Sequence, residues 1–253
     1  MTARLPNCFS ASLRYYSVCA AIGCQAEFFY GEGDFINIIM TLILGIAGGA
    51  LGYMIPYIAN SIALYKCRKK KAELVPDERY SAIYLKLGFC ALNGSVWGIS
   101  GYIADYMPAA VLMAFLFTTA LLVAIIDLRI RIVPNELLLV MIVTGIAFQA
   151  MKFGYTAILV SCVCMAVMVV FFTLVAGMVG FDKVGAGDVK LAGAMGLALG
   201  YPNILTALVI MSAVFVVFSL VGLILRKLTL KTMLPFAPFM MIGMIFTLAY
   251  LVL

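Results

Sequence analysis

Long stretches without a charged residue restrict the fold of this sequence more than any other feature. No residue from Phe35 to Tyr65 is charged, and several later stretches are equally apolar. About 20 apolar residues in a helix suffice to cross the hydrocarbon core of a bilayer. Of the 253 residues, 66% are hydrophobic and only 11% are charged, which lies outside the range of soluble domains. These features predict an integral membrane protein and exclude a soluble globule, a disordered chain and a nucleic-acid-binding module.

Charged residues divide the chain into apolar segments of membrane-spanning length. One apolar segment, Val189–Leu199, is shorter than the rest, and the number of crossings depends on it. If it crosses, the chain is an all-α, polytopic protein with about eight transmembrane helices, and this is the fold that we expect. The other expected helices cover residues 35–65, 82–104, 108–127, 136–151, 156–180, 204–225 and 235–253.

The distribution of basic residues favours eight crossings. With that number, most of the 17 Lys and Arg residues fall in the loops on one side of the membrane. Lys and Arg in short loops mark the cytoplasmic side, so both termini are expected to lie outside.

Two hydrophilic segments lie outside the expected helices. Residues 1–34 resemble neither a membrane span nor a signal peptide, and we expect an N-terminal tail of unknown role. Residues 66–81 form a short basic loop, whose charge is explained by topology and by attraction to anionic lipid. The remaining membrane-embedded domain covers residues 82–253.

The residue types that are missing limit the chemistry. The chain has no histidine, which excludes Ser-His-Asp triads, Cys-His dyads and histidine-containing zinc sites. Its seven cysteines include no Cys-x-x-Cys pair, so their spacing does not support a structural zinc site. We therefore expect neither a metal nor another cofactor, and any hydrolytic chemistry must use other groups.

Two aspartates at the edges of apolar segments are the main candidates for chemistry, because an ionised carboxylate is costly within a membrane. Asp127 ends an uncharged run, and Pro134 requires the helix to stop shortly after it. Asp188 follows Gly185 and Gly187 at the expected start of a new helix. Two glycines one residue apart allow the backbone to approach another backbone or an extended substrate closely.

Most of the surrounding polar residues also have a structural explanation. Asn135 can cap the helix that follows Pro134, with Glu136 in its first turn, and we favour this role over a catalytic one. Asp188 could likewise be a helix N-cap. Four nearby cations could orient anionic substrate groups, although their position in cytoplasmic loops already explains them: Arg129, Arg131, Lys183 and Lys190.

The two aspartates together point to one chemistry. Both fall at the cytoplasmic ends of their helices, and hence at the same depth. Two carboxyl groups that share a proton acquire different apparent pKa values, so that one can activate water while the other acts as an acid. This pattern is typical of an aspartic protease, which needs neither histidine nor metal.

Three motifs, in this order, resemble the type IV prepilin peptidases, a family of membrane aspartic proteases with a Gly-x-Gly-Asp element. They are Asp127 ahead of Pro134-Asn135, the sequence Gly-Ala-Gly-Asp-Val-Lys-Leu at 185–191, and Leu-Pro-Phe-Ala-Pro-Phe at 234–239. The resemblance covers most of residues 44–253. It implies that Asp127 and Asp188 are the catalytic pair. The residues that it implies as substrate-binding or supporting are Gly185, Gly187, Lys190, Pro134, Asn135, Pro235, Phe236, Pro238 and Phe239.

The resemblance also implies a substrate and a location. It indicates an enzyme of the bacterial inner membrane that removes the leader from type IV prepilins or pseudopilins at the cytoplasmic face, with residues 82–253 as the peptidase domain. Larger members of the family carry a zinc-binding insertion with two Cys-x-x-Cys pairs after the first helix, and they also methylate the new N-terminus. Here the loop at that position contains only Cys67, so methyltransferase activity is not expected. Ala237 replaces the glycine that is usual in the last motif.

An ion- or proton-coupled transporter that uses the intramembrane acids is the alternative from another class of protein. Such a protein would more often bury its acids near the bilayer midplane and show an internal repeat. The two aspartates lie near one edge, and the sequence shows no repeat. The peptidase interpretation is therefore favoured.

Overall fold

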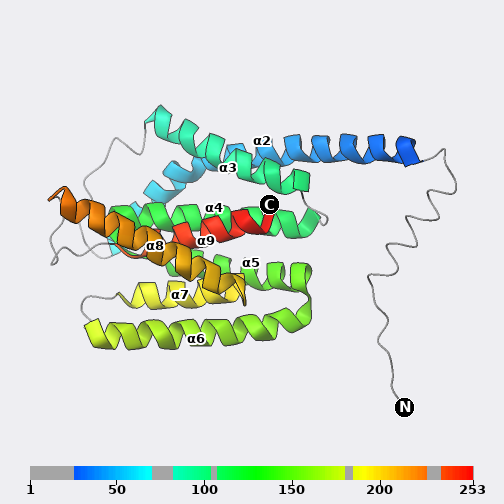
Figure 1. Cartoon of the computed structure of the whole chain (residues 1–253). Coiled ribbons are helices and arrows are strands. Elements are labelled where there is room, and N and C mark those ends of the chain that lie inside the picture. Colours follow the sequence, from blue (N-terminus) through cyan, green and yellow to red (C-terminus); the bar gives the residue numbers. More distant parts are fainter. Residues whose placement is uncertain (1–25, 70–81, 104–106, 180–184, 227–234, 253) are drawn as a thin grey trace, which may run out of the picture.

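The computed structural model describes residues 26–69, 82–103, 107–179, 185–226 and 235–252 (Figure 1). Within these ranges the chain forms eight α-helices and no strand, which confirms the expected all-α fold. The helices are α2 (Ala26–Lys69), α3 (Ile83–Ile103), α4 (Met107–Ile130), α5 (Asn135–Phe153), α6 (Tyr155–Val179), α7 (Ala186–Leu199), α8 (Asn203–Ile224) and α9 (Ala237–Val252).

Five of these helices are long and apolar enough to cross a membrane. They are α4, α5, α8, most of α6, and the part of α2 from Ile38 to Arg68. Helix α9 is a shorter apolar helix, over Ala237–Leu251. A polytopic membrane protein with about eight transmembrane helices is therefore supported.

Two helix boundaries differ from those expected from hydropathy. Helix α2 begins at Ala26 and ends at Lys69, so it extends beyond the expected span of 35–65 in both directions. Helix α7 begins at Ala186 rather than Val189, and it therefore includes Gly187 and Asp188. Hydropathy locates the apolar part of a helix, whereas polar residues such as Glu27 and Lys66 can continue the same helix into water. Most of the tail expected over 1–34 lies outside the described residues.

Helix α4 lies at the centre of the helices, where it packs against α2, α3, α5 and α9 (Figure 1). It is buried along most of its length, and α9 contributes a row of fully buried methionines beside it, Met240, Met241 and Met244. Figure 1 shows α7 between α5 and α6, and both of these helices contact it. Helices α6 and α8 expose most of their apolar side chains, as expected of helices that face lipid.

A buried polar network joins α2, α3 and α4. The Asn93 side chain, which is fully buried, donates from Nδ2 to the Gly48 carbonyl at 2.7 Å. The Thr118 hydroxyl donates to Asn93 Oδ1 at 2.9 Å and accepts from Trp97 Nε1 at 3.0 Å. Hydrogen bonds of this kind stabilise the packing of membrane helices, because lipid provides no alternative partner.

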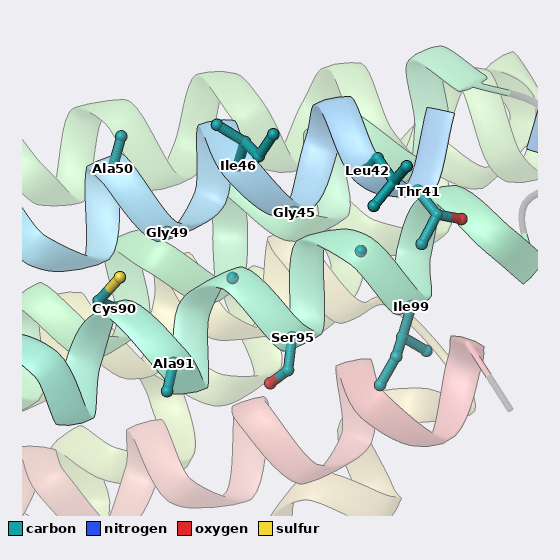
Figure 2. A pocket seen from close by; sticks show the side chains of 12 residues that line it. Thr41, Leu42, Gly45, Ile46, Gly49, Ala50, Cys90, Ala91, Ser95 and Ile99 are labelled. Atoms are coloured by element: carbon teal, nitrogen blue, oxygen red, sulfur yellow. The ribbon is translucent and has the colours of Figure 1, made fainter. Parts of the chain in front are cut away.

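Helices α2 and α3 approach each other closely through glycines. A Cβ built on Gly52 would lie 2.3 Å from the Phe89 carbonyl oxygen, so only glycine fits there. Further along the same pair of helices, small side chains leave an open apolar groove of about 740 Å³ (Figure 2). Leu42 and Ile46 line it from α2, and Cys90 and Ile99 line it from α3.

The C-terminal end of α7 is fixed to α5. The Gln149 side chain, which is 2% exposed, donates from Nε2 to the Ala198 carbonyl at 2.8 Å. A Cβ built on Gly145 would lie 2.8 Å from Ala198 Cα, so the two backbones are in contact. All residues of α7 from Leu191 onward are buried. This anchored end determines where the opposite end of α7, with Asp188, can lie.

Candidate active site

Asp127 lies in the last turn of α4 and is only 5% exposed. Its Oδ2 atom has no hydrogen-bond partner among the described residues. A buried carboxyl oxygen without a partner is costly, so such an atom in a native site is a candidate for chemistry. The helix ends directly afterwards, where the Arg131 N–H donates to the Asp127 carbonyl at 2.9 Å and Arg131 adopts a left-handed φ of 50°.

Asp188 lies in the first turn of α7 and is half-buried. The N-cap position belongs to Gly185, which is extended at φ −66° and ψ 139°. The Asp188 N–H donates to the Gly185 carbonyl at 3.0 Å, and the Gly185 N–H in turn donates to the Asp188 carboxyl group. The alternative in which Asp188 is the N-cap is therefore wrong. Its carboxyl group instead lies over the helix N-terminus, where a negative charge is stabilised.

The turn after α4 packs directly on the start of α7. A Cβ built on Gly187 would lie 3.4 Å from both Val133 Cβ and Val133 Cγ2. This contact brings the two aspartates to the same end of the molecule.

The structure corrects the role of Asn135. Pro134 occupies the N-cap position of α5 in an extended conformation, with φ −69° and ψ 127°, and Asn135 is already the first helical residue. The side chain of Asn135 therefore does not cap the helix. Proline is compatible with this position because the first amides of a helix have no acceptor within the helix. Glu136 lies in the first turn of α5, as expected, and its Oε1 forms a 2.7 Å ion pair with Lys66 Nζ on α2.

The Pro235–Phe239 motif lies at the start of α9, within a cluster of aromatic rings. The Phe236 ring centroid is 5.6 Å from that of Phe215, and the Phe239 ring centroid is 5.2 Å from that of Phe215. Phe236 also contacts Phe172 of α6, at 5.9 Å between centroids. Pro238 is buried beside Phe239, and Pro235 is half-buried. The motif thus joins α6, α8 and α9, and none of its ring contacts involves the two aspartates.

The remaining candidates lie in different environments. Lys190 is exposed on α7, close to Asp188 along the chain. Arg129 donates a hydrogen bond from Nη1 to Asn60 Oδ1 on α2. Lys183 and the nearby Asp182 lie outside the described residues. Within the described ranges, no group of three or more Cys, Asp or Glu side chains could hold a metal ion.

The two motif glycines are not required by the backbone. Neither Gly185 nor Gly187 has a positive φ, and a Cβ at either position would meet its neighbours at ordinary contact distances. The missing side chain at the exposed Gly185 leaves the surface next to Asp188 open, whereas Gly187 lies against Val133.

Sequence reasoning missed the contribution of α2 to this end of the molecule. Asn60 and Lys66 both contact the segment that carries Asp127 and Glu136. Asn60 could have been noticed as a polar residue inside an uncharged, apolar stretch. Lys66 was explained by topology alone, and only the tertiary structure shows its partner.

The fold and the site together define a polytopic helical membrane protein with two aspartates at the same end of its helices. The sequence model of the Type IV leader peptidase family matches residues 113–221. This segment runs from α4 to α8 and includes both aspartates and both motif glycines, and the match confirms the resemblance seen in the motifs. It supports a protease similar to the leader peptidases. No curated protein and no solved structure matches the chain.

Proposed function

We propose that this protein is a membrane aspartic endopeptidase. In this proposal it cleaves the leader peptide from type IV prepilins or pilin-like precursors at the cytoplasmic face of the bacterial inner membrane, with Asp127 and Asp188 as the catalytic pair. The observation that carries the proposal is the placement of both aspartates at one end of the helices, where the turn after α4 packs on Gly187 and Asp127 Oδ2 is buried without a hydrogen-bond partner among the described residues.

The two carboxyl groups would share one proton, because neighbouring carboxylates repel each other when both are ionised. The ionised group takes a proton from water as the water oxygen attacks the scissile carbonyl carbon. The protonated group donates to the carbonyl oxygen. When the tetrahedral intermediate collapses, the C–N bond breaks and a proton passes to the leaving amine. The products are the free leader and a mature protein with a new N-terminus.

The position of the pair suits a substrate with a polar leader followed by an apolar helix. The apolar helix can remain in lipid while the cleavage point reaches carboxyl groups at the membrane boundary. Peptide hydrolysis also needs access to an extended backbone. The absence of a side chain at the exposed Gly185 would allow such a backbone to approach Asp188. No observation favours the transporter alternative.

The test is conversion of a prepilin to its shorter form by purified variants in detergent, with a chelator present. Asp127→Asn and Asp188→Asn should each abolish cleavage while the protein still inserts and folds, because an amide preserves shape but does not exchange a proton. The losses should not add in the double variant, since each change disables the same acid–base pair. Asp182→Asn is the matched control and should retain most activity. Cleavage by Asp188→Asn at a rate near wild type would exclude the aspartic mechanism.

A further inference from the structure

The C-terminal part of α2 holds the segment that carries Asp127 at two points. Asn60 Oδ1 accepts a hydrogen bond from Arg129, which lies two residues after Asp127 in the last turn of α4. Lys66 Nζ forms a 2.7 Å ion pair with Glu136 in the first turn of α5. The two contacts therefore lie on either side of the turn between α4 and α5, which covers residues 131–134.

This turn is the part of the chain that touches the start of α7. Val133 lies within it and packs on Gly187, next to Asp188. A displacement of the turn would move Val133 relative to Gly187. The end of α4, with Asp127, would then shift relative to the start of α7, with Asp188. The turn also contains Arg131 in a left-handed conformation, which is strained for a residue with a side chain. The surrounding contacts must hold such a turn in place.

The shape of α2 directs Asn60 and Lys66 toward this turn. Pro56 lies inside the helix, where its ring removes the hydrogen bond to the Gly52 carbonyl and bends the helix. Figure 1 shows that α2 changes direction partway along its length. From Ile55 onward every fourth residue is buried, and Asn60 and Lys66 flank this stripe of Ile55, Ala59, Ala63 and Cys67.

We propose that the Asn60–Arg129 hydrogen bond and the Lys66–Glu136 ion pair together act as a clamp that positions Asp127 relative to Asp188. Asn60, Lys66, Arg129 and Glu136 are positioning residues in this proposal. They act through the turn and Gly187 rather than by touching the substrate. The proposal rests on the proposed peptidase function, because its effect is a change in the geometry of the aspartate pair.

The clamp acts on geometry more than on stability. The Glu136 side chain is 65% exposed and that of Lys66 is 18% exposed, so solvent screens the ion pair and its contribution to folding is small. A position held by a weak contact can still control catalysis, because small displacements of paired catalytic groups lower the rate steeply. Loss of the clamp should therefore lower kcat while KM and the thermal unfolding temperature stay close to wild type.

Charge exchange across the ion pair provides the first test. Lys66→Glu and Glu136→Lys should each lower kcat for prepilin cleavage by about fivefold, because attraction is replaced by repulsion. The double variant Lys66→Glu/Glu136→Lys restores an ion pair and should recover most of the lost rate. Lys152→Glu is the matched control. It changes an exposed charge in the last turn of α5, about 24 Å from Glu136 along the helix, and should leave kcat unchanged.

Asn60 provides the second test. Asn60→Leu removes one acceptor of the Arg129 guanidinium and should lower kcat, whereas Asn60→Asp keeps an oxygen acceptor at the same place and should retain more of the rate. Because Asp also matches Asn in shape, an unchanged thermal unfolding temperature is needed to separate loss of the hydrogen bond from a general loss of packing. KM and thermal unfolding in the same detergent complete the comparison for each variant.

The outcomes separate the clamp from the proposed function. If the wild-type protein does not cleave prepilin, the proposed function fails. If it does, and the single charge variants keep the wild-type kcat, the clamp alone is excluded. Failure of the double exchange to recover kcat, or an effect confined to KM, would likewise overturn the clamp.

Discussion

Val133 lies so close to Gly187 that a Cβ added to the glycine would just reach van der Waals contact with Val133 Cβ, at 3.4 Å. Gly187→Ala should therefore fold with little change in thermal stability. Gly187→Leu carries atoms beyond Cβ that would displace Val133 and with it the turn after α4. We expect this variant to lose most of its cleavage activity. Comparable activity in the alanine and leucine variants would show that the contact does not set the position of Asp188.

Labelling of introduced cysteines tests which side of the membrane carries the site. The background is a variant in which the native cysteines are replaced and activity is retained. Gly185→Cys should react with an impermeant thiol reagent only after cells are permeabilised, because the distribution of basic residues predicts that this end faces the cytoplasm. Tyr155→Cys is the control at the opposite end of the helices, where Tyr155 is 84% exposed, and it should react in intact cells. The reverse pattern would place the aspartates outside.

The buried polar network predicts a difference between two adjacent threonines. Thr118→Val deprives both Trp97 Nε1 and Asn93 Oδ1 of a partner, and it should destabilise the protein by about 1 kcal/mol. Thr119→Val is its matched control, because within the described part of the chain the Thr119 hydroxyl bonds only to the Leu116 carbonyl of its own helix. Chemical unfolding in detergent measures the difference. Equal stabilities would show that the network contributes nothing to helix packing.

Gly200 ends α7 in a conformation that is open almost only to glycine, with φ 61° and ψ −176°. Gly200→Ala should cost about 1–3 kcal/mol for the backbone alone. A Cβ there would also lie 2.7 Å from Ser161 Oγ, which adds a clash. Gly154 has a similar conformation, with φ 86° and ψ 172°, and nothing within 4 Å of a Cβ. Gly154→Ala should therefore unfold at a higher temperature than Gly200→Ala. The reverse order would show that contact with Ser161 does not add to the cost at Gly200.

The short basic segment 66–81, which begins in the last turn of α2, gives a prediction about the product. Residues 66–81 contain Cys67 but none of the paired cysteines of the zinc-binding insertion of larger family members. The mature substrate released by this enzyme alone should carry a free N-terminal amine. Mass spectrometry of that product, with S-adenosylmethionine supplied, measures this directly. A mass increase of one methyl group would show that the insertion is dispensable.

The sequence by itself determined the helices and the two candidate aspartates. Apolar stretches bounded by charge, proline or glycine predicted the ends of α4, α5 and α8 to within a few residues, because the cost of burying charge in lipid acts locally along the chain. Asp127 and Asp188 stood out for the same reason. Their shared depth followed from counting the crossings and from the positions of the basic residues.

Contacts between distant parts of the chain were decided only by the tertiary structure. The sequence predicted a cap at Asn135, but the turn places Pro134 in that position. It explained Lys66 by topology, whereas the bend of α2 at Pro56 brings Lys66 to Glu136. The Pro235–Phe239 motif packs with aromatic rings of α6 and α8. Hydropathy indicates whether each residue of a helix faces lipid or water. Contacts between residues of different helices depend instead on how bent helices pack against one another.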